Sequence, residues 1–133
     1  MENKREKIRR HTKNLLHSFG YAFQGLYSSF KSERNMKIHI FIMMFVILLG
    51  IVLKISLSEW FVCIILFATV IAGELFNTAI ETIVDMISSG INEKAKLVKD
   101  ISAGGVLALA IGAFVIGLLI FVPKVGSFLM NHF

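Results

Sequence analysis

The chain has 133 residues, 56% of them hydrophobic, which is enough for one domain but not for a large soluble core beside a membrane part. Its net charge is +5, and nine of its fourteen Lys and Arg residues precede residue 38. In so apolar a chain this basic segment is expected to meet anionic lipid headgroups, so nucleic acid is not expected as a partner. The single cysteine, Cys63, lies in an apolar run and indicates neither a disulfide framework nor redox or metal chemistry.

The first predicted element is an amphipathic helix over residues 12–30. Apolar side chains recur there at spacings of three and four residues, which places them on one helix face. They are Leu15, Leu16, Phe19, Ala22, Phe23, Leu26, Tyr27 and Phe30. Because the segment follows a basic stretch, it is expected to lie in the cytoplasmic membrane interface. A soluble helix packed against other protein is the less favoured alternative, since little of the chain is left to cover this face.

Three longer apolar segments follow, at residues 38–57, 60–87 and 103–122. Each has about twenty residues or more, and at about 1.5 Å per residue this crosses a hydrocarbon core of about 30 Å. Ser58 and Glu59 offer a polar start for the second segment, and Gly90 suits its end. Pro123 is expected to stop the third. The chain is therefore predicted to have three transmembrane helices.

A polar loop is expected between the second and third spans. Its charged residues are Glu93, Lys94, Lys96, Lys99 and Asp100. If the N-terminus is cytoplasmic, the cytoplasmic side has twelve of the fourteen Lys and Arg residues, namely nine before residue 38 and three in this loop. The other two lie outside. The positive-inside rule thus predicts a cytoplasmic N-terminus and an external C-terminus in the cell membrane. The fold class is an all-α membrane protein, with a single membrane domain over residues 1–133.

Small residues recur in the third span. Gly104, Ala108 and Gly112 are four residues apart, a spacing that lets helix backbones approach closely in lipid. The pattern predicts tight packing but does not say whether the neighbouring helix belongs to the same chain.

The second span carries polar side chains that are rare in membrane helices. Glu74, Asn77, Glu81 and Asp85 are separated by three, four and four residues, so they share one helix stripe. Exposing such groups to lipid costs at least a few kcal/mol each, so they are expected to face protein, a polar partner or water. Glu74 is the deepest carboxylate, roughly 20 Å of helix from the end of the span.

The spacing alone leaves three interpretations of this stripe open. The first is a structural polar seam that holds helices together, the second is a path for cations or protons, and the third is a metal-assisted active site. Glu33 precedes the first span and Lys99-Asp100 the third, on the same predicted side. They favour the active site, because carboxylates beside a lysine can hold Mg²⁺ and a polyphosphate. The sequence has no Walker motif, so a P-loop or protein-kinase fold is not expected.

The stripe and its neighbours also match a known pattern. The run Glu74-x-x-Asn77-x-Ala79-Ile80-Glu81-x-x-x-Asp85, with Lys99-Asp100 fourteen residues after Asp85, resembles the small prokaryotic diacylglycerol kinase family, which includes undecaprenol kinases. Gly20-Tyr21-Ala22-x-x-Gly25-Leu26 and Ser32-Glu33-Arg34-Asn35 fit in order and spacing, so the resemblance covers about residues 13–122. The Ser-Glu-Arg-Asn form is more similar to the undecaprenol kinase branch. Asn14 stands where the diacylglycerol branch often has arginine.

The resemblance implies an integral membrane lipid kinase that transfers the γ-phosphate of ATP to a lipid alcohol. By the branch comparison this is undecaprenol, with diacylglycerol as the alternative. It also implies a homotrimer whose active sites are shared between subunits. An alternative of another class is a non-enzymatic oligomeric membrane subunit or a proton-conducting protein.

The same resemblance implies roles for matched residues. Glu74 would be the general base that takes the proton of the lipid hydroxyl, and Glu33 and Glu81 would coordinate Mg²⁺. The residues implied at the nucleotide are Tyr21, Glu33, Glu81, Lys99 and Asp100, and those implied as supporting the site are Asn77 and Asp85. His39 in the first span fits either a polar lining of the site or an interfacial histidine, and its position early in the span favours the second.

Overall fold

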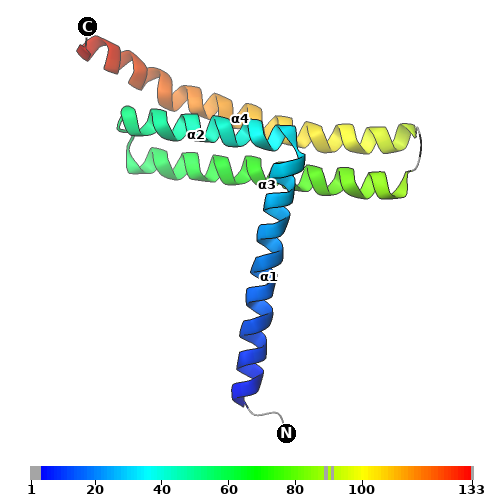
Figure 1. Cartoon of the computed structure of the whole chain (residues 1–133). Helices are drawn as coiled ribbons and strands as arrows, with labels where there is room; N and C mark the ends of the chain where they lie inside the picture. Colours follow the sequence, from blue (N-terminus) through cyan, green and yellow to red (C-terminus); the bar gives the residue numbers. More distant parts are fainter. Residues whose placement is uncertain (1–3, 89, 91, 133) are drawn as a thin grey trace. The chain divides into compact units, whose positions relative to one another are not determined.

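The computed structural model describes residues 4–88, 90 and 92–132, with side chains between residues 14 and 130 in these ranges. The described residues form four α-helices and no strand (Figure 1), which confirms the predicted all-α class. The chain divides into two units, Met1–Glu33 and Arg34–Phe133. The single domain expected over the whole chain stays a prediction.

The first unit is the helix α1, Lys4–Ser32, which contains the predicted range 12–30 and is longer at both ends. Side chains of its predicted apolar face are exposed, including Leu16 (67%) and Phe23 (68%). The helix ends at Ser32, and the backbone N–H of Glu33, the next residue, still donates to Ser29 O at 2.9 Å. The helix is thus confirmed, and its location in the membrane interface stays a prediction.

The second unit consists of α2, Arg34–Val52, α3, Leu57–Ile87, and α4, Glu93–His132. By length and composition all three can cross a membrane, which confirms the predicted number of spans. Successive helices run antiparallel (Figure 1), and α3 packs against α2 and more extensively against α4. The turn between α2 and α3 therefore lies at one end of the unit and the turn between α3 and α4 at the other.

The turn between α2 and α3 differs from the prediction that the first span reaches residue 57 and the second starts at residue 60. The helix α2 ends at Val52, and Lys54 has a left-handed φ of 51°. The N-cap of α3 is Ser56 rather than Ser58. The Ser56 backbone N–H donates to Glu59 Oε2 at 2.6 Å, and the Glu59 N–H donates to Ser56 Oγ at 3.4 Å. This reciprocal capping box starts the helix earlier, because it satisfies two backbone donors at once.

The turn between α3 and α4 also corrects the prediction. The C-cap of α3 is Ser88 and not Gly90, and its N–H donates to Val84 O at 2.9 Å. Asn92 Oδ1 accepts from the backbone N–H groups of Lys94 (2.9 Å) and Ala95 (3.3 Å), as an N-cap does. The charged segment expected as a loop is therefore the beginning of α4.

Pro123 does not stop the last helix, which is longer than the predicted 103–122 at both ends. Proline removes one backbone donor, but a helix in an apolar environment tolerates this where neighbouring groups hold the flanking turns. Ser127 Oγ donates to Pro123 O at 3.0 Å, and Lys124 Nζ lies 3.0 Å from Glu59 Oε2 on α3. The positions of the membrane boundaries along these helices stay predictions.

At Gly73, α3 lies close to a side chain of α4. A Cβ added at Gly73 would lie 2.6 Å from Leu109 Cδ1, so a side chain there must displace Leu109. A Cβ added at Gly104 or Gly112 would meet nothing within 4 Å. Within the described chain, Gly104 and Gly112 therefore allow no close approach of a neighbouring helix that a side chain would prevent.

Candidate functional site

The polar stripe on α3 changes from buried to exposed along the helix. Glu74 is 1% exposed and Asn77 5% exposed, Glu81 is half-buried, and Asp85 is exposed. Glu74 and Asn77, the two deepest polar groups of the stripe, are therefore shielded from solvent. A charged or amide side chain at this depth needs polar partners. The buried end of the stripe is therefore expected to face polar groups.

Two polar contacts lie along the stripe. Asn77 Nδ2 donates to Glu81 Oε1 at 3.1 Å, one helical turn further on. Asn77 Oδ1 is buried and accepts no hydrogen bond from the described residues. Lys99 Nζ on α4 lies 2.5 Å from Asp85 Oδ1. Asn77 thus orients the Glu81 carboxylate, while its own carbonyl oxygen is left to accept from a bound group.

A polar cavity of about 210 Å³ reaches the deep end of the stripe. Its polar lining consists of Asn35 and His39 from α2 and Glu74 and Asn77 from α3. Residues of α4 complete the wall, namely Ala103, Val106, Leu107 and Ala110. Hydrogen-bonding groups of two helices thus meet in a space that α4 closes with apolar side chains.

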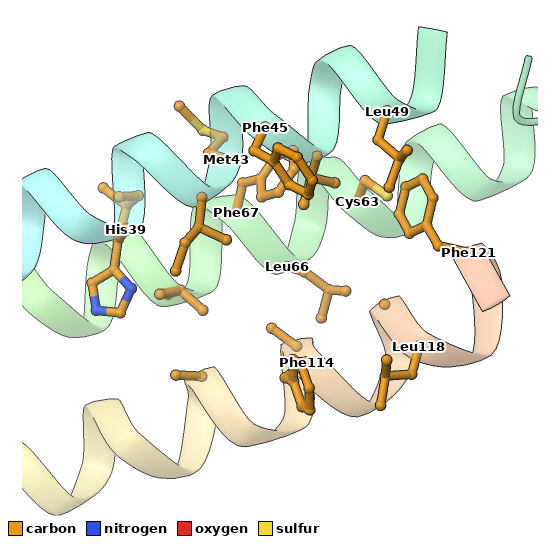
Figure 2. Close-up of a pocket in the computed structure, with 17 residues that line it drawn as sticks. His39, Met43, Phe45, Leu49, Cys63, Leu66, Phe67, Phe114, Leu118 and Phe121 are labelled. Carbon is orange, nitrogen blue, oxygen red and sulfur yellow. The ribbon is translucent and has the colours of Figure 1, made fainter. Parts of the chain in front are cut away.

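An apolar pocket of about 360 Å³ shares lining residues with this cavity. His39 and Ala110 line both spaces. From there the pocket extends between the three helices to Leu49 and Phe121 (Figure 2). Apart from His39, its described lining has no side-chain nitrogen or oxygen. The two spaces together suit an amphiphilic molecule with a small polar end and a hydrocarbon chain.

The second unit brings several of the predicted site residues together. Glu74, Asn77 and Glu81 lie along one stripe, and the Lys99–Asp85 ion pair adds α4 to its exposed end. Asp100 is exposed near the start of α4.

The remaining predicted residues belong to the first unit. Tyr21 is 69% exposed on α1. Glu33 is partly exposed, and its Oε1 accepts from Ser32 Oγ at 3.0 Å. The predicted pairing of Glu33 with Glu81 at a metal ion stays a prediction.

Two lining residues were missed or underrated. Asn35 and His39 are four residues apart, so helical spacing could have placed both on the inner face of α2. His39 lines the cavity, the interpretation that the sequence favoured less.

A metal site is not complete among the described side chains. They contain no group of three or more His, Cys, Asp or Glu residues that could hold a metal ion. Magnesium, however, typically takes one or two carboxylates and completes its shell with water and substrate phosphates. The half-buried Glu81 carboxylate is a ligand of the kind that magnesium takes.

The chain is similar in sequence to known lipid kinases. The model of the prokaryotic diacylglycerol kinase family matches residues 20–121. The undecaprenol kinase of Bacillus subtilis is 37% identical over 107 residues, which cover 80% of this chain and 87% of that protein. The diacylglycerol kinase of Synechocystis sp. is 36% identical over 118 residues, covering 88% of this chain and 67% of that protein. That of Haemophilus influenzae is 34% identical over 109 residues, covering 81% and 92%.

Proposed function

The chain belongs to the prokaryotic diacylglycerol kinase family and is a membrane lipid kinase, and we propose that it phosphorylates undecaprenol with the γ-phosphate of ATP. The observation that carries the proposal is the position of Glu74. The residue is 1% exposed and lines a small polar cavity that shares His39 and Ala110 with a long apolar pocket. A lipid alcohol placed along the two spaces has its hydroxyl near a carboxylate base.

Undecaprenol is preferred over diacylglycerol for two reasons. A relative named undecaprenol kinase is 37% identical over most of both chains. The Ser32-Glu33-Arg34-Asn35 segment also has the form that resembles that branch. Diacylglycerol is the second candidate, because two relatives of 36% and 34% identity are named diacylglycerol kinases.

The proposed reaction uses few residues. Glu74 accepts the proton of the lipid hydroxyl, whose oxygen forms a bond to the γ-phosphorus. The bond from that phosphorus to the oxygen bridging it to the β-phosphate breaks, and ADP leaves with the bonding electrons. Lys99 binds the nucleotide and offsets charge on its phosphates. Asp100 and Tyr21 are assigned to nucleotide binding as well. Asn77 and Asp85 support this arrangement by orienting Glu81 and Lys99.

Magnesium is assigned to Glu81 and Glu33 in this proposal. Carboxylate oxygens with substrate phosphates are the ligands that Mg²⁺ prefers, so this donor set fits the ion. When bound, the ion neutralises charge on the transferred phosphoryl group. Asn77 holds one oxygen of Glu81 by a 3.1 Å hydrogen bond, which leaves the other oxygen for the ion.

The orientation and the assembly belong to the same proposal. ATP is cytoplasmic, so the end of the second unit that carries Lys99 and Asp85 faces the cytoplasm, with the C-terminus outside. The basic N-terminal segment and α1 then lie at the cytoplasmic interface. A homotrimer with shared active sites agrees with the uncovered small residues Gly104 and Gly112, which are available to another subunit. Chemical cross-linking in micelles tests the trimer by the size of the largest cross-linked product.

The test of function is an assay of purified protein in micelles with labelled ATP and Mg²⁺. Undecaprenol and diacylglycerol are offered separately, and Glu74→Gln serves as the matched inactive variant. We expect labelled undecaprenyl phosphate from the wild-type chain at a higher kcat/KM than phosphatidic acid. A preference for diacylglycerol would reassign the acceptor. If neither lipid were labelled at any Mg²⁺ concentration, the active-site assignment would be wrong.

A further inference from the structure

His39 lies where the two spaces of the second unit meet. The inner face of α2 changes from polar to apolar along Asn35, His39 and Met43, which are four residues apart. On α3 the same change occurs between Glu74, which lines the polar cavity, and Ile71, which lines the apolar pocket. Figure 2 shows the His39 ring extending from α2 at one end of the apolar pocket, with Leu49 and Phe121 at the other end.

The His39 ring lacks a hydrogen-bond partner in the described part of the chain, although it is half-buried. Asn77 Oδ1, on the wall of the same cavity, is buried and accepts no hydrogen bond from the described residues either. Buried polar groups are normally hydrogen-bonded, so the unpaired Asn77 Oδ1, with a half-buried imidazole on the same cavity wall, points to a polar ligand. A neutral imidazole has one donor and one acceptor nitrogen, which complements a hydroxyl group.

We propose that His39 is a substrate-positioning residue that donates a hydrogen bond to the hydroxyl oxygen of the lipid alcohol. The hydrocarbon chain of that lipid lies in the apolar pocket, which shares His39 and Ala110 with the polar cavity. With His39 bonded to its oxygen, the hydroxyl is held so that its hydrogen points toward Glu74. The inference rests on the proposed function, since it names the residue that orients the acceptor in the same site.

The kinetic test compares three variants with the wild-type chain. His39→Phe keeps a flat ring and loses both nitrogens, His39→Gln keeps a donor, and His17→Phe makes the same change at an exposed position on α1. For His39→Phe we expect kcat/KM for undecaprenol to fall at least about tenfold, the scale of a lost hydrogen bond to a desolvated group, while KM for ATP stays within about twofold. His39→Gln should recover much of this loss, and His17→Phe should match the wild type. Unchanged kinetics in His39→Phe would overturn the inference while leaving the kinase activity intact.

A binding measurement tests the contact without turnover. The chain has four histidines, and ¹⁵N-histidine NMR in micelles resolves their ring nitrogens, with His39 assigned from its absence in His39→Gln. Farnesol without ATP should shift the His39 signals, whereas the hydrocarbon farnesene, which lacks the hydroxyl, should not. Equal shifts with both compounds, or none with farnesol, would contradict a hydrogen bond to the hydroxyl. This result stands apart from the proposed function, because a chain without kinase activity would still report it.

Discussion

Lys99 Nζ on α4 and Asp85 Oδ1 on α3 lie 2.5 Å apart, so one ion pair joins the two helices beside the turn that connects them. A second ion pair, of Lys124 with Glu59, joins the same helices at 3.0 Å near the opposite end of α3. The two pairs are similar in chemistry, but only the first lies at the end of the polar stripe. They allow a structural role to be separated from a role in nucleotide binding.

We therefore expect different effects from removing the two lysines. Lys99→Met should raise KM for ATP at least about tenfold, the effect of losing a charged hydrogen bond to phosphate. Lys124→Met should leave KM for ATP unchanged. Both variants should lower the thermal unfolding midpoint only slightly, since partly exposed ion pairs contribute little to stability. Initial rates over a range of ATP concentrations, with unfolding followed by circular dichroism, measure both quantities. Equal KM values in the two variants would remove Lys99 from the nucleotide site.

Glu81→Gln tests the proposed metal ligand. Glutamine has nearly the same volume and its carbonyl oxygen can still accept from Asn77 Nδ2, so the packing of α3 should survive. The lost negative charge should reduce turnover at least about a hundredfold and raise the Mg²⁺ concentration needed for half-maximal rate. Glu93→Gln at the start of α4 is the control for loss of a carboxylate outside the stripe. Full activity of Glu81→Gln at the wild-type Mg²⁺ requirement would show that Glu81 is not a ligand.

Glu74→Gln separates the base from the metal ligands. Its turnover should fall by at least about a hundredfold, the usual scale for losing a general base, with ATP and Mg²⁺ affinity nearly unchanged. Glu33→Gln should instead weaken nucleotide binding together with turnover, because a metal ligand already helps to bind the magnesium–nucleotide complex before the reaction. Single-turnover rates and equilibrium nucleotide binding distinguish these patterns. If Glu74→Gln lost ATP binding but kept its turnover at saturating ATP, the two roles would have to be exchanged.

Gly73, next to Glu74, faces the Leu109 side chain of α4. Gly73→Leu should displace the Leu109 side chain, since even a Cβ at this position would lie 2.6 Å from Leu109 Cδ1, and the rest of the leucine should disturb the packing against α4. Overpacking of this kind typically costs about 1–3 kcal/mol of stability, and here it should also raise KM for the lipid. The double variant Gly73→Leu with Leu109→Ala returns most of the added volume and should recover part of both losses. If the double variant were no better than the single one, the contact with Leu109 would not be the cause.

Much of this protein could be predicted from the sequence. The number of membrane helices follows from the length of its apolar segments, because crossing the hydrocarbon core requires about twenty residues whatever the neighbours are. The stripe of Glu74, Asn77, Glu81 and Asp85 follows from helical periodicity, which is also local. The helix ends were less predictable: Asn92 and Ser56 start helices by hydrogen bonds that several nearby polar residues could have made, and Pro123 is tolerated where the flanking turns are held.

The tertiary structure decided what the sequence left open, namely which groups of different helices share a space. His39 is one of several polar residues near the start of the first span, and its place on two cavity walls depends on how α2 and α4 pack against α3. Gly73 carries no chemical signal in the sequence, and only the position of Leu109 shows that a side chain added there would meet α4. Periodicity fixes the face of one helix on which a residue lies, whereas contacts between helices depend on the side chains of both partners.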